Sequence, residues 1–157
     1  MRKNSDFMKV AAQEAVEGVK SGHGGPFGAV IVKDNMIIAR AHNEVIKNND
    51  PTDHAEMIAI RSAAKMLERF DLSDCELYTS CEPCPMCFSA IHWAKIEKVF
   101  YGCTREDAAS IGFDDKYIYD VIKGKAERKK VEFEQKDREL CLEAFDEWKA
   151  REDKVQY

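Results

Sequence analysis

The chain has 157 residues, 45% of them hydrophobic, and is long enough for one globular domain with a sizeable core. Its 24 Lys and Arg against 29 Asp and Glu give a formal net charge of −5. Because tight binding to nucleic acid needs many Lys and Arg contacts to phosphate, this balance argues against a polynucleotide substrate. No apolar run is long enough to cross a membrane and the N-terminus leads into no signal-peptide core, so we expect a cytoplasmic protein without a membrane partner.

The first third of the chain predicts a helix followed by a hairpin. Apolar positions at helical spacing indicate a helix over residues 5–20, which ends in a glycine-rich turn. Apolar runs at residues 27–32 and 36–41 predict two strands. Asp34 and Asn35 lie between them, and both residue types tolerate the positive φ of a two-residue hairpin turn.

The middle of the chain continues to alternate helices and strands. A polar loop leads to a good helix-forming stretch at residues 56–66, so His54 and Glu56 lie where that helix begins. Residues 77–80 have the pattern of a buried strand, and Pro85 suits the first turn of the next helix. The remaining expected elements are a strand at residues 99–101, a short helix at 105–110 and a loop at 111–115. This alternation, without internal repeats, predicts one α/β domain over residues 1–157.

The C-terminal third predicts an amphipathic helix after a basic segment. One helical stripe, which packs either on its own domain or on another subunit, contains Leu140, Cys141, Ala144, Phe145 and Trp148. The segment from Lys123 to Lys130 has five basic residues among eight. We interpret it as a hinge or a solvated charge run in preference to a phosphate-binding patch, because the patch is small and the chain is acidic.

Two short motifs carry the chemistry of the chain, His54-Ala55-Glu56 and Pro83-Cys84-Pro85-Met86-Cys87. An imidazole and two thiolates leave the fourth tetrahedral position of a zinc ion open, as catalytic zinc sites require. Glu56 is not needed as a ligand and is suited to carrying a proton. The combination matches the general signature of zinc deaminases. We therefore predict one Zn²⁺ per subunit, held by His54, Cys84 and Cys87, with Glu56 as the proton shuttle between an activated water and a leaving amino group.

The other cysteines and histidines have simpler interpretations. Cys81 is the fourth ligand in the alternative of a closed structural zinc, but a closed site has no use for Glu56, so we interpret Cys81 as a buried thiol. The other thiols, which lack ligand-spaced partners and are expected in the core or at an interface, are Cys75, Cys103 and Cys141. The histidines without such partners, expected in a loop, at a strand end and on a helix, are His23, His42 and His92.

Four longer runs resemble the bacterial guanine deaminases of the cytidine deaminase superfamily, and the likeness covers nearly the whole chain. These runs are residues 24–32, 49–56, 78–87 and 112–115. The Gly-Phe-Asp-Asp run and the terminal Tyr157 favour the guanine branch, whereas the zinc motif marks only the superfamily. The resemblance implies a three-layer α/β/α fold with a five-stranded mixed sheet and conversion of guanine to xanthine and ammonia. It also implies a homodimer in which a C-terminal segment, about residues 124–157, is exchanged and closes the partner's pocket.

The resemblance also assigns roles around the pocket. Asn43 is expected to hydrogen-bond the base, and Asp115 to be a second carboxylate that binds the purine or moves its protons, with Asp114 as the alternative contact. The other expected substrate contacts are Phe27, Ala55, Trp93 and Tyr157. Without the resemblance, the aromatic residues are equally well explained as core and the two aspartates as a solvated turn.

Other functions stay open. A tRNA adenosine deaminase shares the zinc motif and the pocket asparagine, but it needs a basic surface for the anticodon stem, and the net charge counts against it. Other nucleobases and aminated heterocycles of similar shape are further candidate substrates. A zinc-stabilised binding module without turnover is the non-enzymatic alternative, and it has no need of Glu56.

Overall fold

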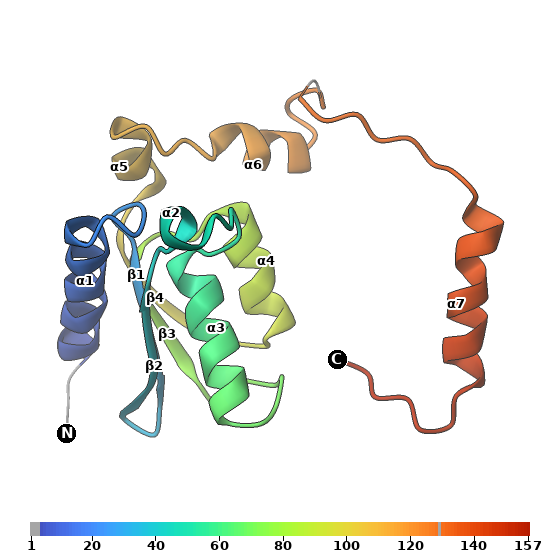
Figure 1. Cartoon of the computed structure of the whole chain (residues 1–157), viewed down its shortest axis with the longest axis horizontal. Helices are drawn as coiled ribbons and strands as arrows, with labels where there is room; N and C mark the ends of the chain where they lie inside the picture. The colour runs from blue at the N-terminus through green and yellow to red at the C-terminus, as the bar shows by residue number, and fades with distance from the viewer. Residues whose placement is uncertain (1–3, 129) are drawn as a thin grey trace.

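The computed structural model describes residues 4–128 and 130–157 and has a three-layer core (Figure 1). The helices are α1 (Asn4–Lys20), α2 (Val45–Asn48), α3 (Ala55–Met66), α4 (Pro85–Trp93), α5 (Arg105–Ser110), α6 (Lys116–Ile122) and α7 (Arg138–Ala150). The strands are β1 (Gly28–Lys33), β2 (Met36–His42), β3 (Glu76–Cys81) and β4 (Lys98–Cys103). Helix α1 covers one face of the sheet, and α3 and α4 cover the other, which confirms the predicted α/β/α layering. In the described part of the chain, no helix is both long and apolar enough to span a bilayer.

The sheet has the strand order β2-β1-β3-β4. Strand β1 pairs antiparallel with β2 and β3, whereas β3 and β4 are parallel because the chain returns through α4. The predicted count of five strands is wrong for the described residues, which form four. The reason is visible in Figure 1: after β4 the chain turns into α5 and α6 and then leaves the sheet, so no strand among the described residues pairs with the outer edge of β4.

The hairpin between β1 and β2 forms where the sequence predicts it. Asp34 and Asn35 have φ values of 48° and 65°, as a type I′ turn requires at both central residues. Lys33 and Met36 are paired across the turn. This turn sets the register of β2, and therefore the position at which β2 ends in His42, directly before Asn43.

Buried side chains on both faces hold the layers together. On the α1 face, the rings of Phe7 and Tyr78 lie 5.3 Å apart and are almost completely buried. On the other face, small residues of α3 such as Ala59 pack against β1 and β2, in a buried cluster that also contains Leu77 of β3. Full burial of one large apolar side chain contributes about 1.5–3 kcal/mol. The middle of β3 therefore belongs to the core on both faces of the sheet, shortly before the loop that leads to α4.

Candidate active site

The three predicted zinc ligands lie at the N-termini of two neighbouring helices. His54 is the N-cap residue of α3 and Cys84 is the N-cap residue of α4, both with extended backbone. Pro85 occupies the first turn of α4, as expected from its fixed φ and missing N–H. Cys87 is the third residue of that helix and is fully buried. Because α3 and α4 pack side by side on the same face of the sheet, their first turns bring the three side chains together.

The spacing of the donor atoms fits a tetrahedral zinc ion. His54 Nδ1 lies 3.5 Å from Cys84 Sγ and 3.6 Å from Cys87 Sγ. Bonds of about 2.3 Å to sulfur and 2.0–2.1 Å to nitrogen at a tetrahedral angle would separate these atoms by about 3.6 Å. All three donors lie within 4.8 Å of one another. The site therefore fits one Zn²⁺ with a fourth position facing away from these ligands.

Without a bound cation, the thiols of Cys84 and Cys87 have different pKa values. The hydrogen bond from Cys87, followed by the contact with His54, lowers the pKa of Cys84 to about 4. The same hydrogen bond and burial raise the pKa of Cys87. One thiolate is thus favoured by the protein alone, and a divalent cation in contact with both sulfurs favours loss of the second proton.

Glu56 lies beside the ligands, and Thr79 holds its carboxylate. The side chain of Glu56 is 5% exposed, and its Oε1 accepts a hydrogen bond of 2.6 Å from the Thr79 hydroxyl. Burial raises the pKa of Glu56. A carboxyl group whose pKa is raised in this way is suited to accept a proton and return it near neutral pH.

Thr79 is a functional residue that sequence reasoning missed. It is completely buried on β3, two residues before Cys81. A threonine hydroxyl in the buried part of this strand was the available signal, because a buried polar group needs a partner.

Replacing Thr79 by Val should lower turnover by about tenfold or more, because a hydrogen bond to a charged group contributes about 1.5–3 kcal/mol. Thr79→Ser keeps the hydroxyl and should restore most of the rate. Steady-state kinetics of both variants would check this. Equal rates in Thr79→Val and wild type would contradict the positioning role.

A cavity of about 860 Å³ opens next to the ligands. The predicted residues that line it are Phe27, Asn43, His54, Glu56, Cys84, Asp114 and Asp115. The ring of Phe27 meets that of Phe113 edge to face, with centroids 5.0 Å apart, and both rings line the cavity. Phe113 was not singled out from the sequence. The volume and the apolar wall suit a flat heteroaromatic ring.

Asn43 is held rigidly at the edge of this cavity. Its Oδ1 accepts a hydrogen bond of 3.1 Å from the backbone N–H of Val45, and its own backbone N–H donates to the carbonyl of Phe27 at 3.0 Å. Gly24 leaves space for the side chain, since a Cβ at that position would lie 2.1 Å from Asn43 Oδ1. With Oδ1 engaged, the amide Nδ2 is the donor that Asn43 can offer to a ligand.

Asp114 and Asp115 reach the cavity from the start of α6. Asp114 Oδ1 accepts a hydrogen bond of 2.9 Å from the backbone N–H of Lys116, whereas Asp115 is the N-cap residue without a side-chain capping bond. Burial, followed by the charge of Cys84, raises the pKa of Asp115. Of the two aspartates, Asp115 is therefore the one whose carboxylate does not cap the first turn of α6.

Helix α6 is anchored to the ligand loop. The Tyr119 hydroxyl donates a hydrogen bond of 2.7 Å to the carbonyl of Pro83, directly before Cys84. The guanidinium of Arg105 lies 3.9 Å from the centroid of the Tyr119 ring and forms an ion pair of 3.0 Å with Glu82. These contacts fix the position of Asp115 relative to the ligands.

Removing the Tyr119 hydroxyl should loosen that anchor without touching the ligands. We expect Tyr119→Phe to raise KM by about 3–10-fold, because a neutral hydrogen bond contributes about 0.5–1.5 kcal/mol. Zinc content should stay at the wild-type value. Substrate saturation curves and metal analysis measure both quantities. An unchanged KM would show that α6 is held mainly by other contacts.

The structure does not place three of the expected substrate contacts on the cavity wall. Trp93 is 64% exposed, because α4 carries it about 9 Å along the helix axis from Cys87, toward the end remote from the ligands. Tyr157 is 65% exposed, and its ring lies 6.1 Å from that of Trp93. Ala55 is fully buried between His54 and Glu56 and does not line the cavity. Trp93 therefore does not line the cavity of this chain, and the lid role of Tyr157 stays a prediction.

The remaining cysteines differ in their surroundings. Cys81 is buried, burial raises its pKa to about 11, and its Sγ lies 3.6 Å from the carbonyl of Thr104, so the structure does not group it with the ligands. Cys75 is a core residue. Cys103 and Cys141 are exposed, so the expectation of a core position is wrong for both, and an interface position stays a prediction.

The fold and this donor set define a zinc-dependent hydrolytic deaminase. The chain belongs to the family of the cytidine and deoxycytidylate deaminase zinc-binding region, whose model matches residues 1–103. It is 51% identical over 151 residues to the guanine deaminase of Bacillus subtilis (strain 168), covering 96% of this chain and 97% of that protein. The X-ray structure of guanine deaminase from Bacillus subtilis superposes with a TM-score of 0.94 at 49% identity, covering 99% of both chains. A tRNA-specific adenosine deaminase of Aquifex aeolicus (strain VF5) is 47% identical over 95 residues, covering 60% of this chain and 62% of that protein.

Proposed function

We propose that the protein hydrolyses free guanine to xanthine and ammonia. The observation that carries this proposal is the extent of the likeness to guanine deaminase, which reaches past residue 103 over 96% of the chain. The likeness to the tRNA-specific enzyme covers only 60%. The residues beyond 103 include Asp114 and Asp115, which line the cavity. The zinc motif supplies the reaction type, and the later residues supply the choice of base.

The reaction needs one proton carrier. When bound, zinc supplies a Lewis acid that lowers the pKa of a water from 15.7 to about 7. Glu56 would accept a proton from a water whose oxygen forms a bond to C2 of guanine. The same carboxyl group then donates a proton to the exocyclic nitrogen, so the C–N bond breaks with ammonia as the leaving group. The hydrogen bond from Thr79 keeps Glu56 within reach of both atoms.

The edges of the base match the polar groups of the cavity. The amide Nδ2 of Asn43 donates to an acceptor of the purine, such as its carbonyl oxygen. Asp115 accepts from a ring N–H on another edge and, with its raised pKa, exchanges that proton. Phe27 covers one face of the ring, supported by Phe113. These contacts explain how the site selects a flat base that has both donors and acceptors.

We also propose that residues 1–157 form one deaminase domain that dimerises by exchanging residues 124–157. Helix α7 stands apart from the sheet on an extended connection (Figure 1). Its apolar stripe, with Leu140 and Phe145, is exposed to solvent in the single chain. A second copy of the chain is the partner that would bury this stripe and bring Tyr157 over a cavity. The six free cysteines suit the reducing cytoplasm.

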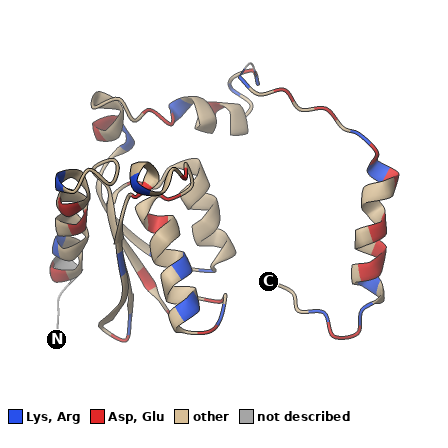
Figure 2. Cartoon of the chain, viewed as in Figure 1, with Lys and Arg blue, Asp and Glu red and all other residues tan. Residues whose placement is uncertain are grey.

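An assay of ammonia release separates the candidate substrates. We expect turnover with guanine and little or none with adenine, cytosine, cytidine or a tRNA anticodon stem-loop. Lys and Arg occur together with Asp and Glu on both α1 and α7 (Figure 2), and this mixed charge does not favour an RNA surface. Activity on the stem-loop alone would overturn the guanine assignment. Turnover of several aminated rings at similar kcat/KM would widen the substrate class.

A further inference from the structure

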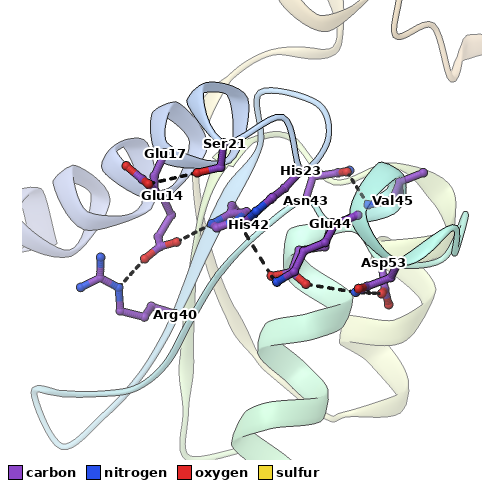
Figure 3. Close-up of polar contacts among 12 residues, drawn as sticks. Glu14, Glu17, Ser21, His23, Arg40, His42, Asn43, Glu44, Val45 and Asp53 are labelled. Carbon is purple, nitrogen blue, oxygen red and sulfur yellow. Dashed lines mark hydrogen bonds and ion pairs between the residues drawn. The ribbon is translucent and has the colours of Figure 1, made fainter.

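A second cluster of metal-binding side chains lies outside the catalytic centre. His23 follows α1, His42 ends β2, and Glu44 precedes α2 (Figure 3). One donor atom from each of these side chains lies within 4.8 Å of the other two. The sequence did not suggest this His23–His42–Glu44 cluster, because the two histidines are 19 positions apart and only the fold brings them together.

The donor distances are close to those of a coordinated ion. His23 Nδ1 lies 2.8 Å from His42 Nε2, and His42 Nε2 lies 3.9 Å from Glu44 Oε1. An ion bound at about 2.1 Å from each atom, with ligand angles between 90° and 110°, needs separations of about 3.0–3.4 Å. Side-chain shifts of less than about 1 Å would bring the His23–His42 and His42–Glu44 donor distances into this range. The Lys47 ammonium, 3.2 Å from Glu44 Oε1, is half exposed and is free to turn away into solvent.

Neighbouring side chains orient the ring of His42 in the way that outer contacts orient a metal-bound histidine. Its Nδ1 lies 2.8 Å from Oε2 of Glu14, which is 8% exposed and also paired with Arg40. Since Glu14 accepts the Nδ1 hydrogen, a neutral His42 turns the lone pair of Nε2 toward His23 and Glu44. Such carboxylate–histidine pairs are the usual outer contacts of metal sites.

The fold holds the backbone of His23 and the ring of His42 in place. The carbonyl of His23 accepts hydrogen bonds of 3.0 Å from the backbone N–H groups of Ile46 and Lys47. The ring of His42 packs on Gly18, where a Cβ would approach its Cδ2 to 2.8 Å. The rings are 5.0 Å apart with an angle of 24° between their planes. The cluster is therefore built into the fold and does not consist of freely moving surface side chains.

We propose that the His23–His42–Glu44 cluster binds a second divalent transition-metal ion per chain, of the imidazole-preferring class to which Zn²⁺ belongs. The ligands are His23 Nδ1, His42 Nε2 and Glu44 Oε1, and Glu14 is the residue that positions His42. Two nitrogen donors disfavour Mg²⁺ and Ca²⁺, which prefer oxygen. Because Asn43 lies between His42 and Glu44 in the chain, the ion would stiffen the segment that carries Asn43. The proposal does not depend on the identity of the base that the catalytic centre deaminates.

Zinc analysis of the full-length protein tests this site. After dialysis against Zn²⁺ and gel filtration, we expect two equivalents per chain in wild type and one in His23→Gln. The matched control is His92→Gln, which changes an exposed histidine on α4 and should keep two. One equivalent in wild type, or two in His23→Gln, would overturn the proposal. Addition of Mg²⁺ in place of Zn²⁺ should leave the cluster empty.

Cobalt distinguishes the two centres by their ligands. Co²⁺ at the catalytic centre gives thiolate-to-metal charge-transfer absorption, whereas the His23–His42–Glu44 cluster should add only visible ligand-field bands. Glu14→Gln should weaken the second binding step about 10–100-fold, as loss of an outer contact typically does. The charge-transfer band also reports whether each variant is folded. A second equivalent that brings further thiolate absorption would place the ion at other cysteines and contradict the assignment.

Discussion

Glu56→Gln should lower the turnover of guanine by about 10²–10⁴-fold, the range that general acid–base catalysis typically contributes. Gln has the size of Glu and still accepts the hydrogen bond from Thr79, but it cannot take a proton from water and return it. The measurement is single-substrate kinetics with guanine, together with zinc analysis. Zinc content should equal that of wild type because Glu56 is not among the donor atoms.

A matched variant tests whether the effect is specific. Glu97→Gln makes the same chemical change at an exposed glutamate after α4, and its rate should equal that of wild type. A Glu56→Gln enzyme with the wild-type rate would remove Glu56 from the mechanism. Loss of zinc together with activity would show that Glu56 is needed for the ligand geometry.

Co-expression of two inactive chains should restore activity if the C-terminal segment is exchanged. One chain carries Glu56→Gln and the complete C-terminus, and the other keeps Glu56 but ends at Asp137, so that it lacks α7. Only the mixed dimer combines an intact carboxylate with a partner's Tyr157. Random pairing makes half of the dimers mixed with one competent site each, so about a quarter of the wild-type activity is expected.

The alternatives give distinct results in the same experiment. If α7 closes the cavity of its own chain, the mixture is no more active than the two parent proteins. If the shortened chain alone has the wild-type rate, the C-terminal segment is not a lid. Zinc content of the shortened chain checks that residues before α7 fold without it.

The local parts of the fold were predictable because they depend on near neighbours in sequence. Asp34 and Asn35 adopt the positive φ that their residue types allow. His54 and Cys84 each stand directly before a helix, where the motif spacing and Pro85 placed them. Such features need only local propensity and the chemistry of the ligands.

Other parts were not predictable because they depend on tertiary placement. The number of strands required knowing that the chain leaves the sheet after β4. The position of Trp93 depends on the direction of α4, and the contact of Thr79 with Glu56 joins residues 23 positions apart. The pairing of His23 with His42 has no signature in spacing, since each looks isolated along the chain.

The placement of two ligands as helix N-caps bears on which ligand types the centre tolerates. Each helix N-terminus carries a partial positive charge equivalent to roughly half an elementary charge. A dication with two thiolates and one neutral imidazole is formally uncharged, so the two helix ends do not oppose it. Replacing Cys84 or Cys87 by His would leave a net positive centre facing two positive helix ends. The partial positive charges of the two helix N-termini thus disfavour an all-imidazole centre before any substrate is bound. The same charges favour thiolate ligands at these positions.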